Sequence, residues 1–208
     1  MKLLSTSLLA ALGLLIYLPS AQATVIIGNL PAVNDSTQSA IAPGRVKALA
    51  FTLASGSDYS LNNVVLRLGG YDSGETLDVQ LRDDGGANPG STVLVSLTAP
   101  ASQGAGNFDY TFTPTAAFAL LADTRYWLYV AFISGTFDFR GSSPGVTPTG
   151  IATLDGNRFS TNGGATFSNS SVINSFQING TEVTVPEPAT LALFALGAAG
   201  FGFRRRAA

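Results

Sequence analysis

The chain has 208 residues with 11 basic and 13 acidic side chains, a formal net charge of −2 at pH 7, and neither cysteine nor histidine. These two absences exclude disulfide bridges, zinc and copper sites built from cysteine or histidine, cysteine nucleophiles and every histidine-based catalytic triad. The acidic balance argues against a nucleic-acid partner, which requires a basic surface to neutralise its phosphates.

The first 23 residues read as a secretory signal peptide. Lys2 precedes an apolar run from about Leu8 to Leu18, and Ala21-Gln22-Ala23 is a small-x-small cleavage site with Ala21 and Ala23 as its small residues. We therefore expect export from the cytoplasm and a mature chain that starts near Thr24. The part that follows is long enough for one domain with a sizeable core.

Between the signal peptide and residue 185, short apolar runs follow the period of two that is typical of β-strands. Apolar and polar residues alternate along Leu77–Arg82 and Phe108–Thr113, whereas Tyr126–Ile133 is apolar on both faces, as a central strand would be. The same spacing predicts further strands around residues 49–53, 64–68, 93–97, 137–139 and 176–178. Turn-forming residues fill the gaps, and no stretch keeps a helical period. The pattern predicts a single all-β domain, an antiparallel β-sandwich or jelly roll.

The body offers few residues for catalysis. Lys47 alternates with Leu49, so we expect its amine to face solvent rather than to serve as the base for a serine nucleophile. Glycan hydrolysis needs two carboxyl groups about 5 to 9.5 Å apart, one of them with a pKa raised by an apolar setting. The body has Glu75, Glu182 and ten aspartates, most of them in turns or at outward strand positions. We therefore predict that the protein is not an enzyme, with a glycan-active enzyme as the most distant alternative.

Asp83, Asp84 and Asn88 lie in one glycine-rich loop, DDGGANPG, directly after a predicted strand. Oxygen-rich loops of this kind hold Ca²⁺, although the spacing is not that of an EF-hand because no glutamate closes the loop. Turn chemistry is the alternative, since the glycines and Pro89-Gly90 favour a turn in which Asp and Asn bond to the nearby backbone. Calcium is the one cofactor that the sequence suggests.

Trp127 and Tyr129 are two residues apart in a predicted strand, so their side chains point to the same face. On an exposed sheet face, a flat aromatic pair of this kind stacks on the apolar faces of sugar rings, as in many carbohydrate-binding modules. This predicts a glycan-binding site. The alternative is that both faces of the strand are buried, one by a facing sheet and the other by a loop such as 141–150.

Two motifs in the body occur together with a suitable strand pattern. The strand Leu77–Arg82 runs into an Asp-x-Gly-Gly-x-x-Pro-Gly turn at residues 83–90, and a Thr-x-Tyr-Trp strand start follows in Asp123–Leu128. With Val64–Leu68 they resemble the choice-anchor R domain, a group of bacterial extracellular domains, over residues 40–180. The resemblance implies an extracellular location and one of several C-terminal anchors, and it implies no known catalysis.

The chain ends in a segment of three parts. Pro186-Glu187-Pro188 is stiff and extended, because proline fixes φ and lacks a backbone donor. An uncharged run follows from Ala189 to Phe203, and then come Arg204, Arg205 and Arg206. As a helix the run would span about 22 Å, short of the ~30 Å hydrocarbon core, but a locally thinned membrane can hold it. The positive-inside rule keeps the arginines in the cytoplasm and places the body outside.

This tail resembles the PEP-CTERM sorting signal of Gram-negative bacteria. In that family an integral-membrane cysteine transpeptidase, the exosortase, recognises the Pro-Glu-Pro motif and removes the tail, and the family is associated with exopolysaccharide and biofilm matrix. The resemblance implies an exosortase as partner, a transient stay in the inner membrane, and delivery to the cell surface or extracellular matrix. A plain single-pass tail anchor is the alternative.

These predictions divide the chain into a signal peptide (1–23), a β-sandwich domain (24–184) and a sorting signal (185–208). We expect an exported, non-catalytic component of the cell surface or biofilm matrix that an exosortase processes. A carbohydrate-binding module that holds exopolysaccharide through Trp127 and Tyr129 is the alternative. We expect no nucleic-acid partner.

Overall fold

The structure, a computed structural model, describes residues 22–183. The predictions about Ala21, the Pro186-Glu187-Pro188 motif and Arg204–Arg206 lie outside these residues. Within them the chain forms fourteen β-strands and no helix. The strands are β1 (Ala23–Gly28), β2 (Thr37–Ile41), β3 (Val46–Thr52), β4 (Tyr59–Gly69), β5 (Thr76–Asp84), β6 (Pro89–Thr98), β7 (Asn107–Pro114), β8 (Ala119–Leu120), β9 (Arg125–Ser134), β10 (Phe137–Gly141), β11 (Thr149–Gly150), β12 (Thr153–Ser160), β13 (Ser168–Asn169) and β14 (Phe176–Glu182). Over this range the structure has no helix that could span a lipid bilayer.

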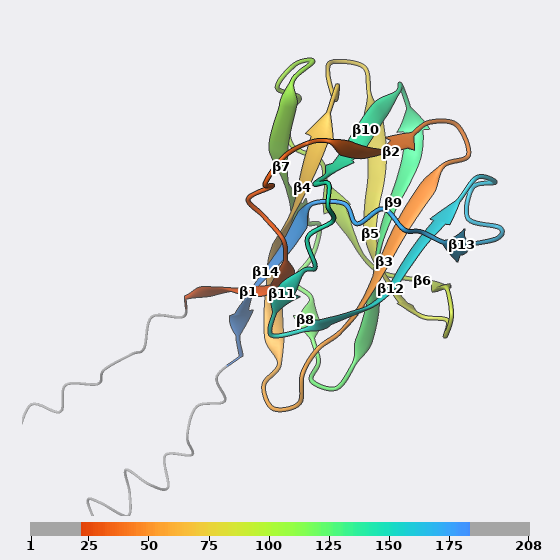
Figure 1. Cartoon of the computed structure of the whole chain (residues 1–208). Helices are drawn as coiled ribbons and strands as arrows, with labels where there is room; N and C mark the ends of the chain where they lie inside the picture. The colour runs from red at the N-terminus through yellow and green to blue at the C-terminus, as the bar shows by residue number, and fades with distance from the viewer. Residues whose placement is uncertain (1–21, 184–208) are drawn as a thin grey trace, which may run out of the picture.

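All strand pairs are antiparallel and belong to one curled sheet (Figure 1). Its order is β11-β1-β14-β4-β7-β6-β5-β9-β3-β12-β13, with β10 bonded to β2 and β4, and β8 bonded to β4. Only two residue pairs, Leu97–Pro114 and Thr98–Thr113, join β6 to β7. At this point the sheet turns, so that the half from β11 to β7 shares its interior with the half from β6 to β13.

One apolar core fills the space inside the curl. Leu66 and Phe176 from the first half are fully buried in the same cluster as Leu49, Phe51 and Leu128 from the second half. Period-two alternation explains this arrangement, because every second residue of each strand reaches the interior. Each buried side chain of this size contributes about 1.5–3 kcal/mol, and a chain without cysteine depends on these contributions.

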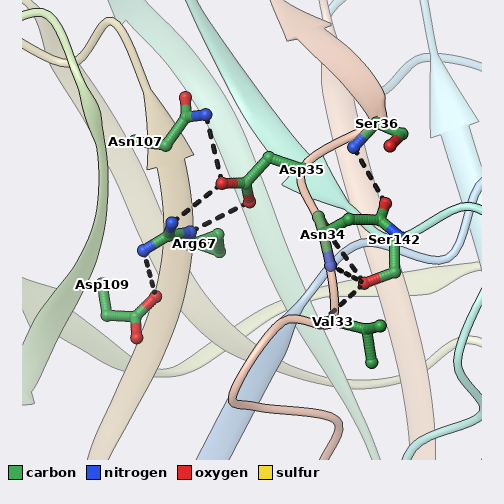
Figure 2. A network of polar contacts seen from close by, with 8 residues as sticks. All are labelled: Val33, Asn34, Asp35, Ser36, Arg67, Asn107, Asp109 and Ser142. Atoms are coloured by element: carbon green, nitrogen blue, oxygen red, sulfur yellow. Dashed lines mark hydrogen bonds and ion pairs between the residues drawn. The ribbon is translucent and has the colours of Figure 1, made fainter.

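Polar contacts, rather than strand pairing, attach the segment between β1 and β2 to the sheet. Arg67 of β4 donates from Nε and Nη2 to the two carboxylate oxygens of Asp35, at 3.0 and 2.8 Å (Figure 2). Asn107 of β7 donates to the same carboxylate at 3.1 Å, and Arg67 also contacts Asp109 at 3.2 Å. The fork of the guanidinium therefore joins this crossing segment, residues 29–36, to β4 and β7.

A serine fixes the same crossing segment on its other side. Ser142 Oγ accepts hydrogen bonds from the backbone N–H groups of Val33 and Asn34, at 3.1 and 3.3 Å, and donates to Asn34 O at 3.0 Å (Figure 2). The Ser142 side chain thereby satisfies backbone groups of the crossing segment that have no sheet partner.

The prediction of an all-β, antiparallel fold is confirmed, and each predicted strand coincides with an observed one, although the strand predicted at 49–53 runs one residue past the end of β3. Tyr126–Val130 in β9 is buried on both faces, as expected of a central strand. The sequence patterns did not predict β1, β2, β12 or the two-residue strands β8, β11 and β13. In β2 (TQSAI) and β12 (TLDGNRFS) polar residues dominate, since much of each strand faces solvent.

Candidate functional site

The aromatic pair of β9 is buried. Trp127 and Tyr129 share a face, as predicted, but their exposed fractions are 0% and 4%. They lie opposite Ala50 and Ala48 of β3, whose small side chains leave room for the rings on the outer face of the sheet. The prediction of an exposed aromatic platform is therefore wrong, because no sugar ring reaches the face of either side chain.

The cover over this pair comes from β12 and the loop that follows it. A Cβ added at Gly156 would lie 3.0 Å from the Trp127 ring, and one added at Gly164 would lie 2.7 Å from the Tyr129 hydroxyl. Glycine at these two positions therefore allows the backbone to lie against the aromatic side chains. The alternative of a strand buried on both faces holds, although the cover is not the loop 141–150.

The DDGGANPG loop is hydrogen-bonded to Trp127 of this pair. Asp84 Oδ1 accepts hydrogen bonds from Trp127 Nε1 at 3.0 Å, from Arg125 Nη1 at 3.1 Å and from the backbone N–H of Gly86 at 3.0 Å. The Arg125 guanidinium lies 5.0 Å from the centroid of the Trp127 ring, within the range of a cation–π contact. Two sites that seemed separate in the sequence form one network, which gives the buried indole N–H its acceptor.

The Asp83 carboxylate bonds elsewhere in the loop. Asp83 Oδ1 accepts from the backbone N–H of Thr92 at 3.0 Å, and a Cβ added at Gly90 would collide with its carboxylate. Within residues 22–183 no group of three or more acidic, histidine or cysteine side chains is placed to hold a metal ion. Calcium binding by Asp83, Asp84 and Asn88 stays a prediction, and the ion would compete with the Arg125 guanidinium for Asp84.

Lys47 lies inside the molecule, and the prediction that it faces solvent is wrong. Residues two apart in a strand share a face, so Lys47 points the same way as Leu49, which lies in the core. Its exposed fraction is 1%. The amine donates to Ser170 Oγ at 2.6 Å and to the carbonyl oxygen of Val172 at 2.7 Å. The alternation that identified Leu49 as a core residue also assigns residue 47, two positions earlier, to the core face.

Burial lowers the pKa of Lys47 from its ordinary value of 10.5 to about 7. The cause is desolvation, which disfavours the charged amine. Both hydrogen-bond acceptors of this amine are neutral oxygens, so neither offsets the cost as a carboxylate would. At neutral pH this amine is therefore charged less often than the amine of an exposed lysine.

Lys47 lines a cavity of about 290 Å³. It lies where β2, β3 and β12 meet the segment 169–172, and we call it the lysine pocket. Its lining residues include Ile41, Arg45, Lys47, Phe159, Asn169 and Ser171.

A serine hydroxyl beside a lysine amine can serve nucleophilic catalysis. Here Ser170 Oγ accepts from Lys47 and also from the backbone N–H of Val172 at 3.3 Å, as in a local turn. Asn157 Nδ2 donates to the carbonyl oxygens of Ser170 and Val172, at 3.1 and 2.9 Å. Lys47 and Asn157 together hold this segment against β3 and β12, which is a positioning role.

The tail of the chain matches a known sequence family. Residues 184–206 match the PEP-CTERM protein-sorting motif. They include Pro186-Glu187-Pro188 and Arg204–Arg206, so the predicted sorting motif is confirmed. The motif implies an exported protein that passes through the membrane to the cell surface or beyond it and is processed by an exosortase. Among curated proteins none matches this chain.

Proposed function

We propose that the folded body is a non-catalytic component of the cell surface or of the extracellular biofilm matrix. The observation that carries this proposal is the PEP-CTERM motif, because it implies export of the body to the cell surface or beyond it. Charged residues make up 12% of the chain, about half of the usual ~25%. A surface with few charges depends little on salt, which suits a hydrated matrix.

We further propose that the curled sheet is a sandwich similar to the choice-anchor R domain. The core shared by the two halves of the sheet supports this, as does the observed structure of the DDGGANPG hairpin. In this reading Asp84 and Trp127 hold that hairpin against β9 and carry no ligand.

Exopolysaccharide binding is the second candidate function. It stays a prediction of the sequence, because the buried aromatic pair does not provide its site.

The experiment that tests the proposed route is an intact-mass measurement on protein from the exterior of the producing cells. We expect a mature chain that starts near Thr24 and lacks Arg204–Arg206. Cells without the exosortase should retain the uncut chain in the membrane fraction.

The matched control replaces Pro186, Glu187 and Pro188 with alanine and leaves the apolar run and the arginines intact. This variant should stay uncut in cells that contain the exosortase. Exterior protein that still carries the three arginines would refute the proposed route, as would a wild-type chain that never leaves the cell.

A further inference from the structure

The segment that follows β12 covers the edge of the sheet, and we call residues 161–172 the strap. The strap contains β13, the last strand in the sheet order, and only the pairs Arg158–Asn169 and Phe159–Ser168 join it to β12 as a ladder. None of its residues is buried. A segment with few buried contacts and few backbone pairs opens at a lower free energy than the core strands do.

Lys47 attaches the end of the strap to β3. Both acceptors of its amine, Ser170 Oγ and Val172 O, belong to the strap. Asn157 of β12 bonds to the carbonyl oxygens of the same two residues, but its amide does not titrate. The lysine amine is therefore the attachment of the strap whose charge depends on pH.

A charge on this amine favours the open strap. While the strap is closed, the amine is buried and bonded only to neutral oxygens, so its charged form is disfavoured. When the strap opens, water solvates the amine and restores its ordinary pKa of 10.5, against about 7 in the closed strap. Between these values opening takes up a proton, so the strap should open less often as the pH rises.

Among the described residues, no other group beside this amine titrates over the same range. The strap itself contains no titratable side chain. Arg45 is the other titratable residue that lines the lysine pocket, and it stays charged. The paired strands place Phe159 and Val130 opposite the lysine. The charged residues of β12, Asp155 and Arg158, do not line the pocket.

We propose that the strap is a cover that opens as the pH falls, released when the Lys47 amine becomes charged. Opening uncovers the edge of β12 and the Tyr129 side chain, against which Gly164 and Phe167 of the strap lie. Burial raises the pKa of the Tyr129 hydroxyl, so this group stays neutral while the strap responds. The proposed structural role needs no moving part, so this inference goes beyond it, and it does not depend on the sorting route.

Hydrogen–deuterium exchange of the full-length chain, in a neutral detergent at pH 6 and pH 9, tests the switch. After correction for the intrinsic effect of pH on exchange, the amides of the strap should open about tenfold more often, or more, at pH 6. At both pH values they should be less protected than the amides of β9. A strap without this pH response would overturn the proposal. So would a strap as well protected as β9, since its opening would then be that of the whole fold.

Two substitutions assign the response to the lysine. Lys47→Met should abolish the pH response of the strap, because no buried amine remains. Arg45→Gln is the matched control, since it changes an exposed cation beside the same pocket, and its strap should respond as in the wild type. A response that persists in Lys47→Met, or that disappears in Arg45→Gln, would refute the role of the lysine. If Lys47→Met does not fold, the wild-type comparison of the strap with β9 still decides the proposal.

Discussion

Lysine is rarely buried without a partner of opposite charge, and Lys47 is buried with two neutral acceptors. The cost of desolvation appears as a pKa of about 7. In return, the Lys47 amine holds the segment 170–172 against β3 through two hydrogen bonds. An apolar side chain at this position would leave both acceptor oxygens unpaired. The stability of the whole fold then depends on the protonation of one side chain.

Stability should rise with pH on account of Lys47. The folded-state pKa of about 7 is below the unfolded value near 10.5, so between these values the unfolded chain binds more protons and alkaline pH favours the fold. From pH 7 to pH 9 we expect the wild type to gain about 2 kcal/mol relative to Lys47→Met. Urea unfolding at both pH values measures this difference, and parallel behaviour of the two proteins would contradict it.

At the scale of single elements, the crossing segment 29–36 shows how a stretch without strand pairing is held in place. Its polar groups bond to side chains that β4, β7 and residue 142 provide (Figure 2). The Arg67 side chain beside Asp35 holds the pKa of that carboxyl below its usual range, through a hydrogen bond first and charge attraction second. This attachment is therefore sensitive to acid.

Acid should weaken the attachment of the crossing segment. Because the folded-state pKa of Asp35 is lowered, its contribution is fully present above about pH 4 and is lost as the pH falls through the lowered value. Asp35→Asn should cost about 1–3 kcal/mol at pH 7 and remove this part of the acid sensitivity.

Thermal melting of wild type and Asp35→Asn between pH 7 and pH 2 measures the acid effect. Asp109→Asn is the control, since Asp109 contacts Arg67 through one bond from a more exposed position. It should cost less than Asp35→Asn. A larger cost for Asp109→Asn would show that the bidentate pair is not the main attachment.

At the scale of the whole molecule, the core joins two halves of one sheet that meet through few backbone pairs. The core faces of the two halves are buried against each other. If one half unfolded, the core face of the other half would therefore be exposed to solvent. The two halves should consequently behave as one cooperative unit.

Urea unfolding should show a single transition. Trp127 is the one tryptophan of the chain and reports on β9, whereas far-ultraviolet circular dichroism reports on all strands. We expect the two signals to change at the same urea concentration. A tryptophan transition that precedes or follows the circular dichroism change would show that the halves unfold separately.

Sequence patterns predicted the strands that bury one face or both, because burial imposes alternation or a continuous apolar run. They did not predict β2 and β12, which are largely polar because solvent covers much of them. Trp127 shows the limit for a site. The spacing predicted the strand of Trp127 and the face to which its side chain points. It did not predict that β12 and Asp84, which are distant in sequence, bury the ring. The sequence analysis placed Lys47 on the solvent face of its strand, which was wrong. The period of two puts Lys47 on the same face as Leu49, which lies in the core.

The pairing of β1 with β14 has a mechanical consequence. Ala23 lies opposite Thr181, so the two ends of the described chain emerge together at one corner of the molecule (Figure 1). If the protein were tethered through its C-terminal end, fluid drag would apply force to the domain at this corner. The pull would enter through β14, which is an inner strand bonded to β1 on one side and β4 on the other. Two hydrogen-bonded ladders would therefore share the load, and a domain tethered in this way would resist being pulled apart.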